Sequence, residues 1–347
     1  MEGARLNALV VVDADVLGRE RTGDETYVRN LLRELAPLAP EAGIRLVAVT
    51  RNPDLVPEDV EAVELRTRSQ ELRMAWTLSR LLGRLGADLC HTQYAVPLRA
   101  PCPCVVTVHD LSFARAPELM GWKDRLVFRR VVPRSVLRAA RVLTVSERSR
   151  HDLVELYGVP GERIVVTANG VDPAFHPPGQ GELVPADYVL SVGAIQRRKN
   201  QLAALAAAQA AGLPLRVAGP AKDASLANEL RRRGARLEGY VDVERLAELY
   251  RGAACLVQSS RYEGFGLPVL EAMACGTPVV AVPEPALQEV AGEAAVLVPE
   301  TRLAEGIRRA LEEREQLVAA GLERAREFSW RAAAERTLAA YQEILGA

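Results

Sequence analysis

The segment from Arg261 to Ala281 combines residues that could bind a phosphate, and it reads RYEGFGLPVLEAMACGTPVVA. Gly264 and Gly266 allow the backbone to come close to a ligand, because glycine has no Cβ. Pro268 suits the first turn of a helix, which we expect to run to about Cys275. The N–H groups and the positive dipole end at the start of that helix favour an anion. The segment therefore predicts a loop and a helix N-terminus that hold a phosphate.

Two glutamates flank this turn, Glu263 before it and Glu271 near the first full turn of the expected helix. Their carboxylates could bracket one ligand, each accepting hydrogen bonds from hydroxyl groups. From the residues alone, the alternative stays open that the glycines form an ordinary strand-to-helix turn, with one glutamate as a cap and the other on a solvated face. A dinucleotide fingerprint is matched less well, because Val269 stands where its third glycine would be.

Cationic and imidazole groups follow two other β-branched runs. Arg198 and Lys199 come after Tyr188–Val192, where they either neutralise a phosphate or form a solvated basic turn. His109 comes after Val105–Val108, and a lone histidine in such a place is either functional or part of the core. Ligands bind beyond the carboxyl ends of parallel strands, so these positions favour a functional site.

The elements that must position these residues show the pattern of parallel βαβ units, in which short β-branched runs alternate with longer stretches rich in Ala, Leu and Arg. A Pro- and Gly-rich stretch at residues 173–181 separates two series of strands. The expected strands are Ala8–Val12, Arg45–Val49, Val105–Val108, Val142–Val145 and Ile164–Val166, then Tyr188–Val192, Leu215–Ala218, Ala253–Val257, Pro278–Ala281 and Ala295–Val298. The sequence predicts an α/β protein with two Rossmann-like doubly wound domains facing across a cleft.

Length, charge and cysteine content narrow the class of protein. A chain of 347 residues suits two domains, and a net charge of −1 gives no field that would attract nucleic acid. Five cysteines in mostly apolar runs indicate reduced thiols in a core, and a soft-metal site at Cys102 and Cys104 is the less favoured alternative. No run is long enough for a signal peptide or a membrane span, so we expect a cytoplasmic protein.

The Glu-x7-Glu spacing of Glu263 and Glu271 resembles that of the retaining, GT-B-fold glycosyltransferases of family 4 (group 1), which include mannosyltransferases and enzymes of polysaccharide biosynthesis. The resemblance covers nearly the whole chain. Four further segments match that family in the expected order: Thr107–Phe113, Leu143–Ser149, Asn169–Asp172 and Gly193–Asn200. It implies an acceptor domain at residues 1–172, a linker at 173–181, a nucleotide-sugar-binding domain at 182–327, and a C-terminal helix at 328–347 that crosses back to the first domain.

The same resemblance assigns roles to single residues. It implies that Glu263 contacts the donor sugar, that Glu271 contacts the ribose, and that His109 lies near the donor sugar. Arg198 and Lys199 would bind the diphosphate, and these two cations join His109 and Glu263 as the catalytic group. The other donor-binding residues that it implies are Gly23, Gly193, Tyr240, Val241, Gly264, Phe265, Gly266 and Leu267. The loop before the first helix departs from the family, because Glu25 stands at its second glycine and Gly18 competes with Gly23.

For the reaction, the resemblance implies transfer of a hexose, with a preference for mannose, from a UDP- or GDP-sugar to a glycan or lipid-linked acceptor. No other cofactor and no metal would be needed, and the leaving phosphate would itself help to deprotonate the acceptor. Asp13 and Asp15 spell the Asp-x-Asp of metal-dependent transferases, so a metal there is an alternative. A GT-B-fold epimerase or phosphorylase, and a catalytically silent sugar-nucleotide-binding subunit, also stay open.

The segment from Arg115 to Arg150 holds ten Lys or Arg residues against three acidic ones, in a chain that is otherwise neutral. Arginines alternate there with apolar residues, which we expect to form one stripe that packs on the sheet. The apolar residues are Leu126, Val127, Val131, Val132, Val136 and Leu137, and the arginines are Arg125, Arg129, Arg130, Arg134 and Arg138. The basic face is either plainly solvated or attracts an anionic acceptor through peripheral contact with the inner membrane surface.

Overall fold

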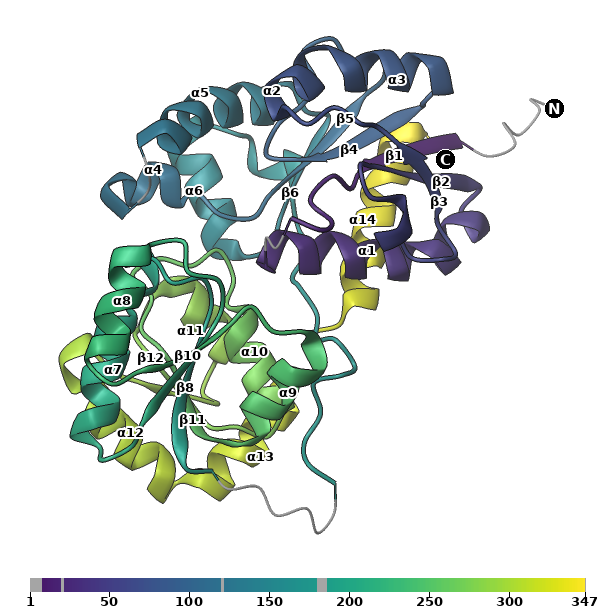
Figure 1. Ribbon diagram of the computed structural model, residues 1–347. Coiled ribbons are helices and arrows are strands. Elements are labelled where there is room, and N and C mark those ends of the chain that lie inside the picture. The colour runs from purple at the N-terminus through teal and green to yellow at the C-terminus, as the bar shows by residue number, and fades with distance from the viewer. Residues whose placement is uncertain (1–7, 20–21, 120–121, 180–185, 347) are drawn as a thin grey trace. The chain divides into compact units, whose positions relative to one another are not determined.

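The computed structural model describes residues 8–19, 22–119, 122–179 and 186–346, and the chain divides into two compact units. Unit 1 comprises Met1–Gly170 together with Trp330–Ala347, and unit 2 comprises Val171–Ser329 (Figure 1). Each unit has its own parallel β-sheet flanked by helices. The chain passes from unit 1 to unit 2 just before the stretch that we expected to be the linker, and the last helix belongs to unit 1.

Unit 1 is built on a seven-stranded sheet in the order β3-β2-β1-β4-β5-β6-β7. The strands are β1 (Ala8–Asp13), β2 (Ile44–Thr50), β3 (Glu61–Glu64), β4 (Leu89–Gln93), β5 (Cys104–Val108), β6 (Arg141–Thr144) and β7 (Ile164–Val166). The helices are α1 (Thr22–Glu41), α2 (Gln70–Leu72), α3 (Leu78–Leu85), α4 (Ser112–Arg115), α5 (Trp122–Arg138), α6 (Glu147–Tyr157) and α14 (Trp330–Leu345). All five strands predicted for this region are present, and β3 and β4 were missed.

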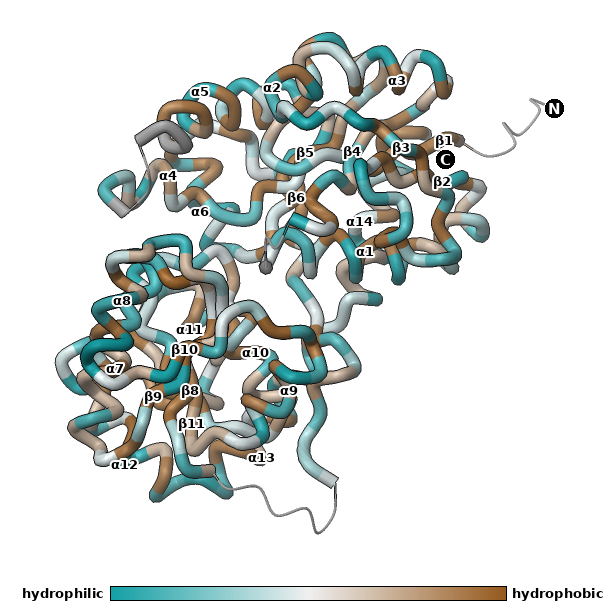
Figure 2. Tube along the Cα trace, in the orientation of Figure 1, coloured by the Kyte–Doolittle hydropathy of each residue, from teal (hydrophilic) through white to brown (hydrophobic). Residues whose placement is uncertain are grey.

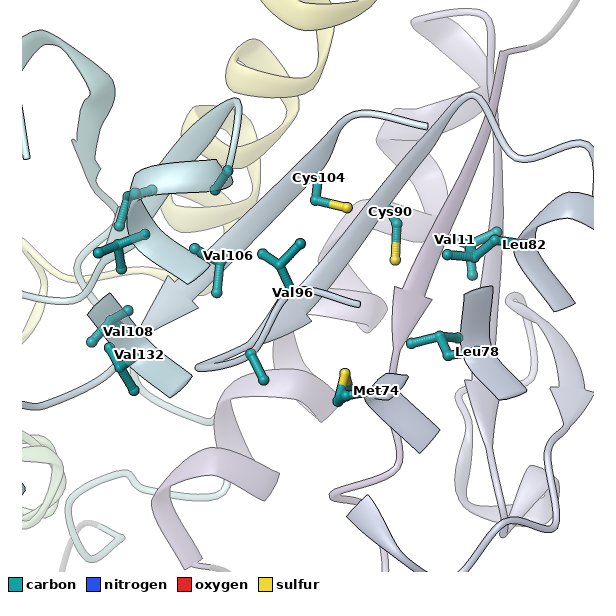
Figure 3. Packing of buried hydrophobic residues seen from close by; sticks show 14 of the residues in the cluster. Val11, Met74, Leu78, Leu82, Cys90, Val96, Cys104, Val106, Val108 and Val132 are labelled. Atoms are coloured by element: carbon teal, nitrogen blue, oxygen red, sulfur yellow. The ribbon is translucent and has the colours of Figure 1, made fainter. Parts of the chain in front are cut away.

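The core of unit 1 follows from its β-branched strands, which are buried on both faces, as in other parallel sheets covered by helices. Figure 3 shows part of this core, where strand residues such as Val11 and Val106 share one cluster with Met74 and Leu78. The thiols of Cys90 and Cys104 lie in the same cluster, on paired positions of β4 and β5. All five cysteines of the chain are free thiols.

Helix α14 packs on unit 1 against α1. The indole of Trp330 lies edge-on to the ring of Tyr27, with 6.1 Å between the centroids. The hydroxyl of Tyr341 lies 2.6 Å from Nδ1 of His91, and Nε2 of His91 lies 2.7 Å from the hydroxyl of Thr107. Burial lowers the pKa of His91 to about 3, so this ring is neutral at physiological pH. A buried polar chain therefore joins α14 to β4 and β5.

Helix α5 corrects the expected apolar stripe. Val132 and Val136 are fully buried against the sheet, and Val131 is half-buried. Leu126, Val127 and Leu137 are instead 46%, 46% and 52% exposed, because the helical period places them on the opposite face, beside the arginines. The tube in Figure 2 shows hydrophobic and hydrophilic residues alternating along α5. Among the described residues, no helix is both long and apolar enough to cross a membrane.

Unit 2 is built on a six-stranded sheet in the order β10-β9-β8-β11-β12-β13. The strands are β8 (Tyr188–Val192), β9 (Leu215–Ala218), β10 (Arg236–Gly239), β11 (Ala253–Gln258), β12 (Val279–Ala281) and β13 (Val296–Leu297). The helices are α7 (Gln201–Ala210), α8 (Ala224–Arg232), α9 (Val243–Arg251), α10 (Leu267–Ala274), α11 (Pro285–Ala291), α12 (Leu303–Glu312) and α13 (Arg314–Ala325). The five predicted strands are present, and β10 is the strand that was missed.

Candidate functional site

The candidate site of unit 2 lies at the carboxyl ends of β8 and β11. In the order β10-β9-β8-β11-β12-β13 the direction of winding reverses between these two neighbours, and ligands bind at such a switch point in open α/β sheets. Residues 193–200 follow β8, and residues 259–266 follow β11. Lys199 and Glu263, which belong to two segments that the sequence singled out and lie 64 positions apart, thus meet at one point of the sheet.

Three glycines turn the backbone sharply at this edge. Gly193, Gly219 and Gly239 lie at the ends of β8, β9 and β10, with φ of 129°, 144° and 74°. A Cβ on Gly219 would lie 2.2 Å from the carbonyl oxygen of Gly193, so a larger residue would force the backbone to move. Sequence reasoning named Gly193 and missed Gly219. The signal for Gly219 was its place directly after a predicted strand.

Glu263 is buried and forms ion pairs with both expected cations. Its Oε1 accepts a hydrogen bond from Lys199 Nζ at 2.6 Å, and its Oε2 accepts one from Arg198 Nη1 at 3.2 Å. Gln258 Nε2 donates to Oε1 at 2.8 Å. Burial alone would raise the pKa of Glu263, but the charges of Lys199 and Arg198 outweigh it and lower the pKa to about 2. The site therefore holds one ionised carboxylate between two cations.

The surrounding backbone positions these cations. Arg198 Nη1 also donates to the carbonyl oxygen of Tyr262 at 2.5 Å. Asn200 takes a left-handed φ of 53°, and the hydroxyl of Ser259 donates to the carbonyl oxygens of Lys199 and Asn200. The side chains of Arg198 and Lys199 keep 15% and 12% of their surface exposed. Both cations are ordered and still accessible, which suits binding of an anion.

The turn before α10 has the tight geometry that the glycines predicted. Gly266 has a φ of 124°, which favours glycine, and a Cβ there would lie 3.1 Å from Leu287 Cδ2. Helix α10 begins directly after it at Leu267, with Pro268 in the first turn. The ring of Phe265 is buried against Phe328, with 5.9 Å between centroids, so the backbone of this residue is what it can offer a ligand. In the first turn of α10, Pro268 has no N–H and the N–H of Val269 donates to the carbonyl oxygen of Gly266, so Leu267 is the residue of this turn whose N–H suits a phosphate.

Glu271 lies on α10 in a different environment from Glu263. Its Oε2 accepts a 2.7 Å hydrogen bond from the hydroxyl of Tyr250, and both side chains are buried. Burial raises the pKa of Glu271 to about 7, although the Tyr250 hydroxyl favours the charged form. The negative charge of Asp172 adds to the rise, and the positive charge of Lys199 opposes it. Glu263 is thus held ionised, whereas Glu271 titrates near neutral pH.

Tyr240 and Val241 follow β10, next to the turn at Gly239. The ring of Tyr240 is 52% exposed, and Val241 is half-buried. The N–H of Gly219 donates to the carbonyl oxygen of Gly239 at 2.7 Å, which joins this segment to the end of β9. These two residues therefore lie at the same edge of the sheet as Gly193.

Sequence reasoning missed four polar residues around the carboxylates: Gln258, Ser260, Tyr250 and Glu284. Gln258 Nε2 bridges Glu263 and the hydroxyl of Ser260, at 2.8 and 3.1 Å. Tyr250 contacts Glu271, as described above. Glu284 is buried and caps α11. A polar residue at the end of an otherwise apolar strand was the signal for Gln258, and no sequence pattern marked Tyr250 or Glu284.

In unit 1, His109 follows β5 and is buried beside an aromatic ring. Its centroid lies 4.6 Å from that of Tyr27, and its Nε2 lies 3.2 Å from Gln93 Oε1. Burial lowers the pKa of His109, although the charges of two nearby aspartates oppose the change. The ring is therefore neutral at physiological pH. In that state one ring nitrogen can donate a hydrogen bond and the other can accept one.

Asp13 and Asp15 are buried and paired with arginines. Arg73, itself fully buried, donates to Asp13 Oδ1 at 2.5 Å. Arg51 donates to Asp15 Oδ1 at 2.9 Å, and Arg19 pairs with Asp15 Oδ2. A divalent cation at this Asp-x-Asp pair would have to displace these guanidinium groups. The contacts favour an ion-pair network over the metal alternative.

Gly23 lies in the first turn of α1 and is exposed. A Cβ added there would meet no heavy atom within 4 Å, so the fold itself does not require glycine at this position. Gly18, the competing candidate, has a φ of 77°, and its N–H donates to Glu25 Oε1 at 3.0 Å. The buried carboxylate of Glu25 thus binds the backbone at Gly18. Contact of Gly23 with a ligand stays a prediction.

A group of potential metal ligands lies on α6, where His151, Asp152 and Glu155 place one ligand atom each within 4.8 Å of one another. Both carboxylates are paired with the same guanidinium group. Arg115 Nε donates to Asp152 Oδ1 at 2.8 Å, and its Nη2 pairs with Glu155. Arg148 lies 3.4 Å from the other oxygen of Asp152. The arginines balance this charge, and the cluster serves as an ion-pair network between α4 and α6.

Two family models match successive parts of the chain. The model described as Glycosyltransferase Family 4 matches residues 21–175, and the model described as Glycosyl transferases group 1 matches residues 178–328. The O-antigen chain mannosyltransferase B of Escherichia coli is 33% identical over 266 residues, which cover 69% of this chain and 70% of that protein. A D-inositol 3-phosphate glycosyltransferase of Acidothermus cellulolyticus is 30% identical and covers 98% of this chain and 86% of that protein.

Solved structures share the fold over nearly the full length. A sucrose-phosphate synthase from Thermosynechococcus elongatus superposes with a TM-score of 0.79 at 22% identity, covering 98% of this chain and 99% of that one. Anabaena Alr3699/HepE, solved in complex with UDP-glucose, gives a TM-score of 0.70 at 16% identity and covers 98% of both chains. At these identities the likeness shows the fold alone.

Proposed function

Because the chain belongs to the group 1 glycosyltransferases of family 4 and has the GT-B fold, we propose that it transfers a hexose from a nucleoside-diphosphate sugar and retains the anomeric configuration. The acceptor is a glycan or a lipid-linked acceptor. The observation that carries the proposal is the buried Glu263 carboxylate between Lys199 and Arg198 at the switch point of unit 2. Such a group offers cations to a diphosphate and hydrogen-bond acceptors to sugar hydroxyls.

The chemistry of the leaving group explains the cations. A departing nucleoside diphosphate gains negative charge in the transition state, and preorganised positive groups stabilise that charge without transferring a proton. Lys199 and Arg198 supply the charge, and the N–H groups of Phe265, Gly266 and Leu267 add dipoles. The reaction then needs no metal, which agrees with the arginine partners of Asp13 and Asp15 described above. We assign retention to a front-face route, in which the leaving phosphate helps to deprotonate the acceptor.

The remaining residues orient the donor. Glu263 accepts hydrogen bonds from the sugar hydroxyls once the cations turn to the diphosphate, and Glu271 accepts them from the ribose. Gly193, Gly23 and Gly264 provide close backbone approach, and Tyr240 and Val241 lie beside the base. His109 acts as a neutral hydrogen-bonding group near the donor sugar.

Two observations bear on the identity of the donor. The similarity to the E. coli mannosyltransferase supports mannose as the transferred sugar. The fold shared with a protein that was solved in complex with UDP-glucose is a reason to test UDP-sugars as well. We propose mannose as the transferred hexose, and both nucleotides enter the test.

The deciding experiment mixes the protein with a panel of UDP- and GDP-sugars and measures release of the nucleoside diphosphate with and without glycan acceptors. Release that depends on an acceptor, together with a new α-linked product from an α-linked donor, supports the proposal. Release that depends on water alone or on inorganic phosphate indicates an epimerase or a phosphorylase. Binding without release indicates a silent subunit. The same assay compares Arg198→Gln, which removes one of the two cations, with the control variant Arg197→Gln, since the Arg197 side chain is 77% exposed.

For the acceptor side, we propose a cytoplasmic protein whose α5 contacts the inner membrane surface. The exposed face of α5 joins Leu126, Val127 and Leu137 to Arg130 and Arg134, which pairs apolar side chains with positive charge. Each exposed cation near an anionic leaflet contributes on the order of 1 kcal/mol.

Co-sedimentation with vesicles tests this membrane contact. Binding that rises with anionic lipid, falls with salt and drops in an Arg129/Arg130/Arg134→Ala variant supports it. Equal indifference to neutral and anionic vesicles refutes it and leaves the face as a solvated one.

A further inference from the structure

A row of polar side chains lies on one face of the sheet of unit 1, where β4 and β5 run side by side. Gln93 is paired with Thr107 across these two parallel strands. Because side chains alternate along a strand, His91 shares this face with Gln93. The hydroxyl of Thr107 lies 2.7 Å from Nε2 of His91 and 3.2 Å from the hydroxyl of Tyr27. The row ends at the carboxyl edge of the sheet, where Gln93 meets His109.

Gln93 holds one nitrogen of the His109 ring. Its Oε1 lies 3.2 Å from Nε2 of His109. A side-chain amide oxygen only accepts hydrogen bonds, so Nε2 is the donor and carries the ring proton. Burial lowers the pKa of His109, so the ring is neutral at physiological pH and Nδ1 carries no proton. Gln93 therefore determines which nitrogen of His109 can accept a hydrogen bond.

Other contacts fix the plane and the backbone of His109. The ring of Tyr27 meets it edge-on, with 4.6 Å between the centroids and 78° between the planes. The centroid of the Tyr94 ring lies 5.6 Å away, and the hydroxyl of Ser149 donates to the carbonyl oxygen of His109 at 3.3 Å. Tyr94 has a left-handed φ of 58°, a conformation that costs energy in a tyrosine and is found at functional sites. The turn that carries Gln93 and Tyr94 is thus shaped around the His109 ring.

We propose that Gln93 is a positioning residue for sugar transfer, which holds Nε2 of His109 so that Nδ1 accepts a hydrogen bond from a hydroxyl group of the donor sugar. The inference rests on the proposed function, which places His109 near that sugar. Gln93 acts through His109 and not on the sugar itself. Without Gln93 the ring can turn over or exchange its proton between the two nitrogens, so the state that contacts the sugar is populated only part of the time.

The contact is tested first by NMR titration of the ring in protein that carries isotope-labelled histidine, with His109→Asn to assign the resonances. Gln93→Glu puts a carboxylate in place of the amide, and Gln93→Met keeps a chain of similar length without the oxygen. Gln70→Glu, on the exposed surface of α2, is the matched control. Thermal unfolding of each variant checks the fold.

The other groups around His109 stay the same in these variants. The negative charges of Asp24 on α1 and of Asp110, directly after His109, favour its charged form. The titratable rings that face it or interact with its charge are those of Tyr27, Tyr94 and His91. Gln93→Glu should raise the pKa of His109, because a carboxylate beside Nε2 favours the imidazolium, and Gln70→Glu should leave it unchanged. In Gln93→Met the Nε2 proton should exchange with water faster than in the wild type.

Kinetics with the sugar nucleotide that the wild type uses test the role in transfer. Gln93→Met should lower kcat by about 3- to 10-fold, the range for loss of one hydrogen bond, with unchanged affinity for UDP or GDP. Gln93→Glu keeps the acceptor and should retain kcat above the raised pKa of His109. Below that pKa the ring becomes an imidazolium without an acceptor nitrogen, so kcat should fall at a pH where the wild type is still active. A merely structural role would change stability without moving this pH profile.

An unchanged pKa of His109 in Gln93→Glu overturns the inference, as does a wild-type kcat in Gln93→Met. An equal loss of kcat at every pH in Gln93→Glu also overturns it. If the wild type transfers no sugar of the panel, the proposed function fails and the role of Gln93 in transfer fails with it. A failed NMR titration in an active enzyme overturns the inference alone.

Discussion

Replacing Glu271 by Gln should make the protein more stable above neutral pH while weakening donor binding. In the folded chain, burial holds the pKa of Glu271 at about 7, whereas a glutamate in the unfolded chain titrates near 4.5. Glutamine keeps an oxygen that can accept the hydrogen bond from Tyr250, so the packing at this point is preserved. The substitution therefore isolates the cost of a buried negative charge.

The sign and size follow from proton linkage. Between pH 4.5 and 7 the folded chain keeps a proton on Glu271 that the unfolded chain has released, so the free energy of unfolding falls as pH rises through this window. The gap between the two pKa values corresponds to about 3 kcal/mol, which the wild type lacks above pH 7 and regains below pH 4.5. Glu271→Gln should regain that stability above pH 7.

Melting temperatures of wild type and Glu271→Gln at pH 5 and pH 8 test this reasoning. For a unit of this size each kcal/mol shifts the transition by roughly 2–4 °C, so a gain of several degrees is expected at pH 8 and much less at pH 5. Donor affinity at pH 8 should fall by about 10- to 100-fold, since in the proposed function Glu271 is the charged acceptor of the ribose. The exposed Glu293→Gln is the matched control. A variant that gains the same stability at both pH values, or that binds the donor normally, refutes the argument.

Three further predictions concern the ion pair of Lys199, the effect of EDTA, and the last helix. Lys199→Met should lower stability by up to about 3–5 kcal/mol, because the buried Glu263 carboxylate loses a partner, and should weaken binding of nucleoside diphosphates, because a cation is lost. The exposed Arg197→Met should have neither effect, and calorimetry with UDP and GDP measures both stability and binding. Sugar transfer should survive EDTA, and a loss that manganese restores would transfer the role of the cations to a metal. Trp330→Ala should destabilise unit 1 by about 3–5 kcal/mol in chemical denaturation, because the buried indole packs on Tyr27, and an unchanged transition would contradict that packing.

Much of the fold could be predicted from β-branched runs, and the strands that escaped show where that signal ends. β3 reads Glu-Ala-Val-Glu and lies at the edge of its sheet, largely exposed, so it carries little hydrophobic pattern. β4 contains the polar residues His91, Thr92 and Gln93, and the ring of His91 is accommodated by contacts that only the folded chain provides. β10 reads Arg-Leu-Glu-Gly and lies at an edge of the six-stranded sheet of unit 2. Polar strands are stable where tertiary contacts or an edge position permit them, which local sequence does not reveal.

The apolar stripe of α5 illustrates a different limit. The sequence showed apolar residues between arginines, but three of them turn away from the sheet. Val132 and Val136 lie four residues apart and share the buried face, whereas Leu126 and Leu137 fall on the exposed face with the arginines. Assigning each residue of the segment a position around the helix, rather than counting the apolar residues, would have separated the two faces.

In the candidate site, sequence reasoning located the residues but not their partners. It placed Glu263, Lys199 and Arg198 correctly at strand ends, and the fold brings them within hydrogen-bonding distance. It could not find Tyr250, because a tyrosine in a helix gives no sign of the carboxylate that it will meet. It also missed Glu284, whose pairing depends on how β12 lies beside β11.

The two glutamates that the sequence singled out in unit 2 differ in ways that a purely structural role does not require. Glu263 is balanced by cations, so the fold could keep it for stability alone. Glu271 is buried with a raised pKa and a single tyrosine partner, and a neutral residue of the same shape would serve the fold better by about 3 kcal/mol at pH 8. A residue that costs stability is retained when function uses it. The less stable carboxyl of Glu271 therefore points to a ligand hydroxyl group more strongly than the well-paired Glu263 does, although Glu263 stood out first in the sequence.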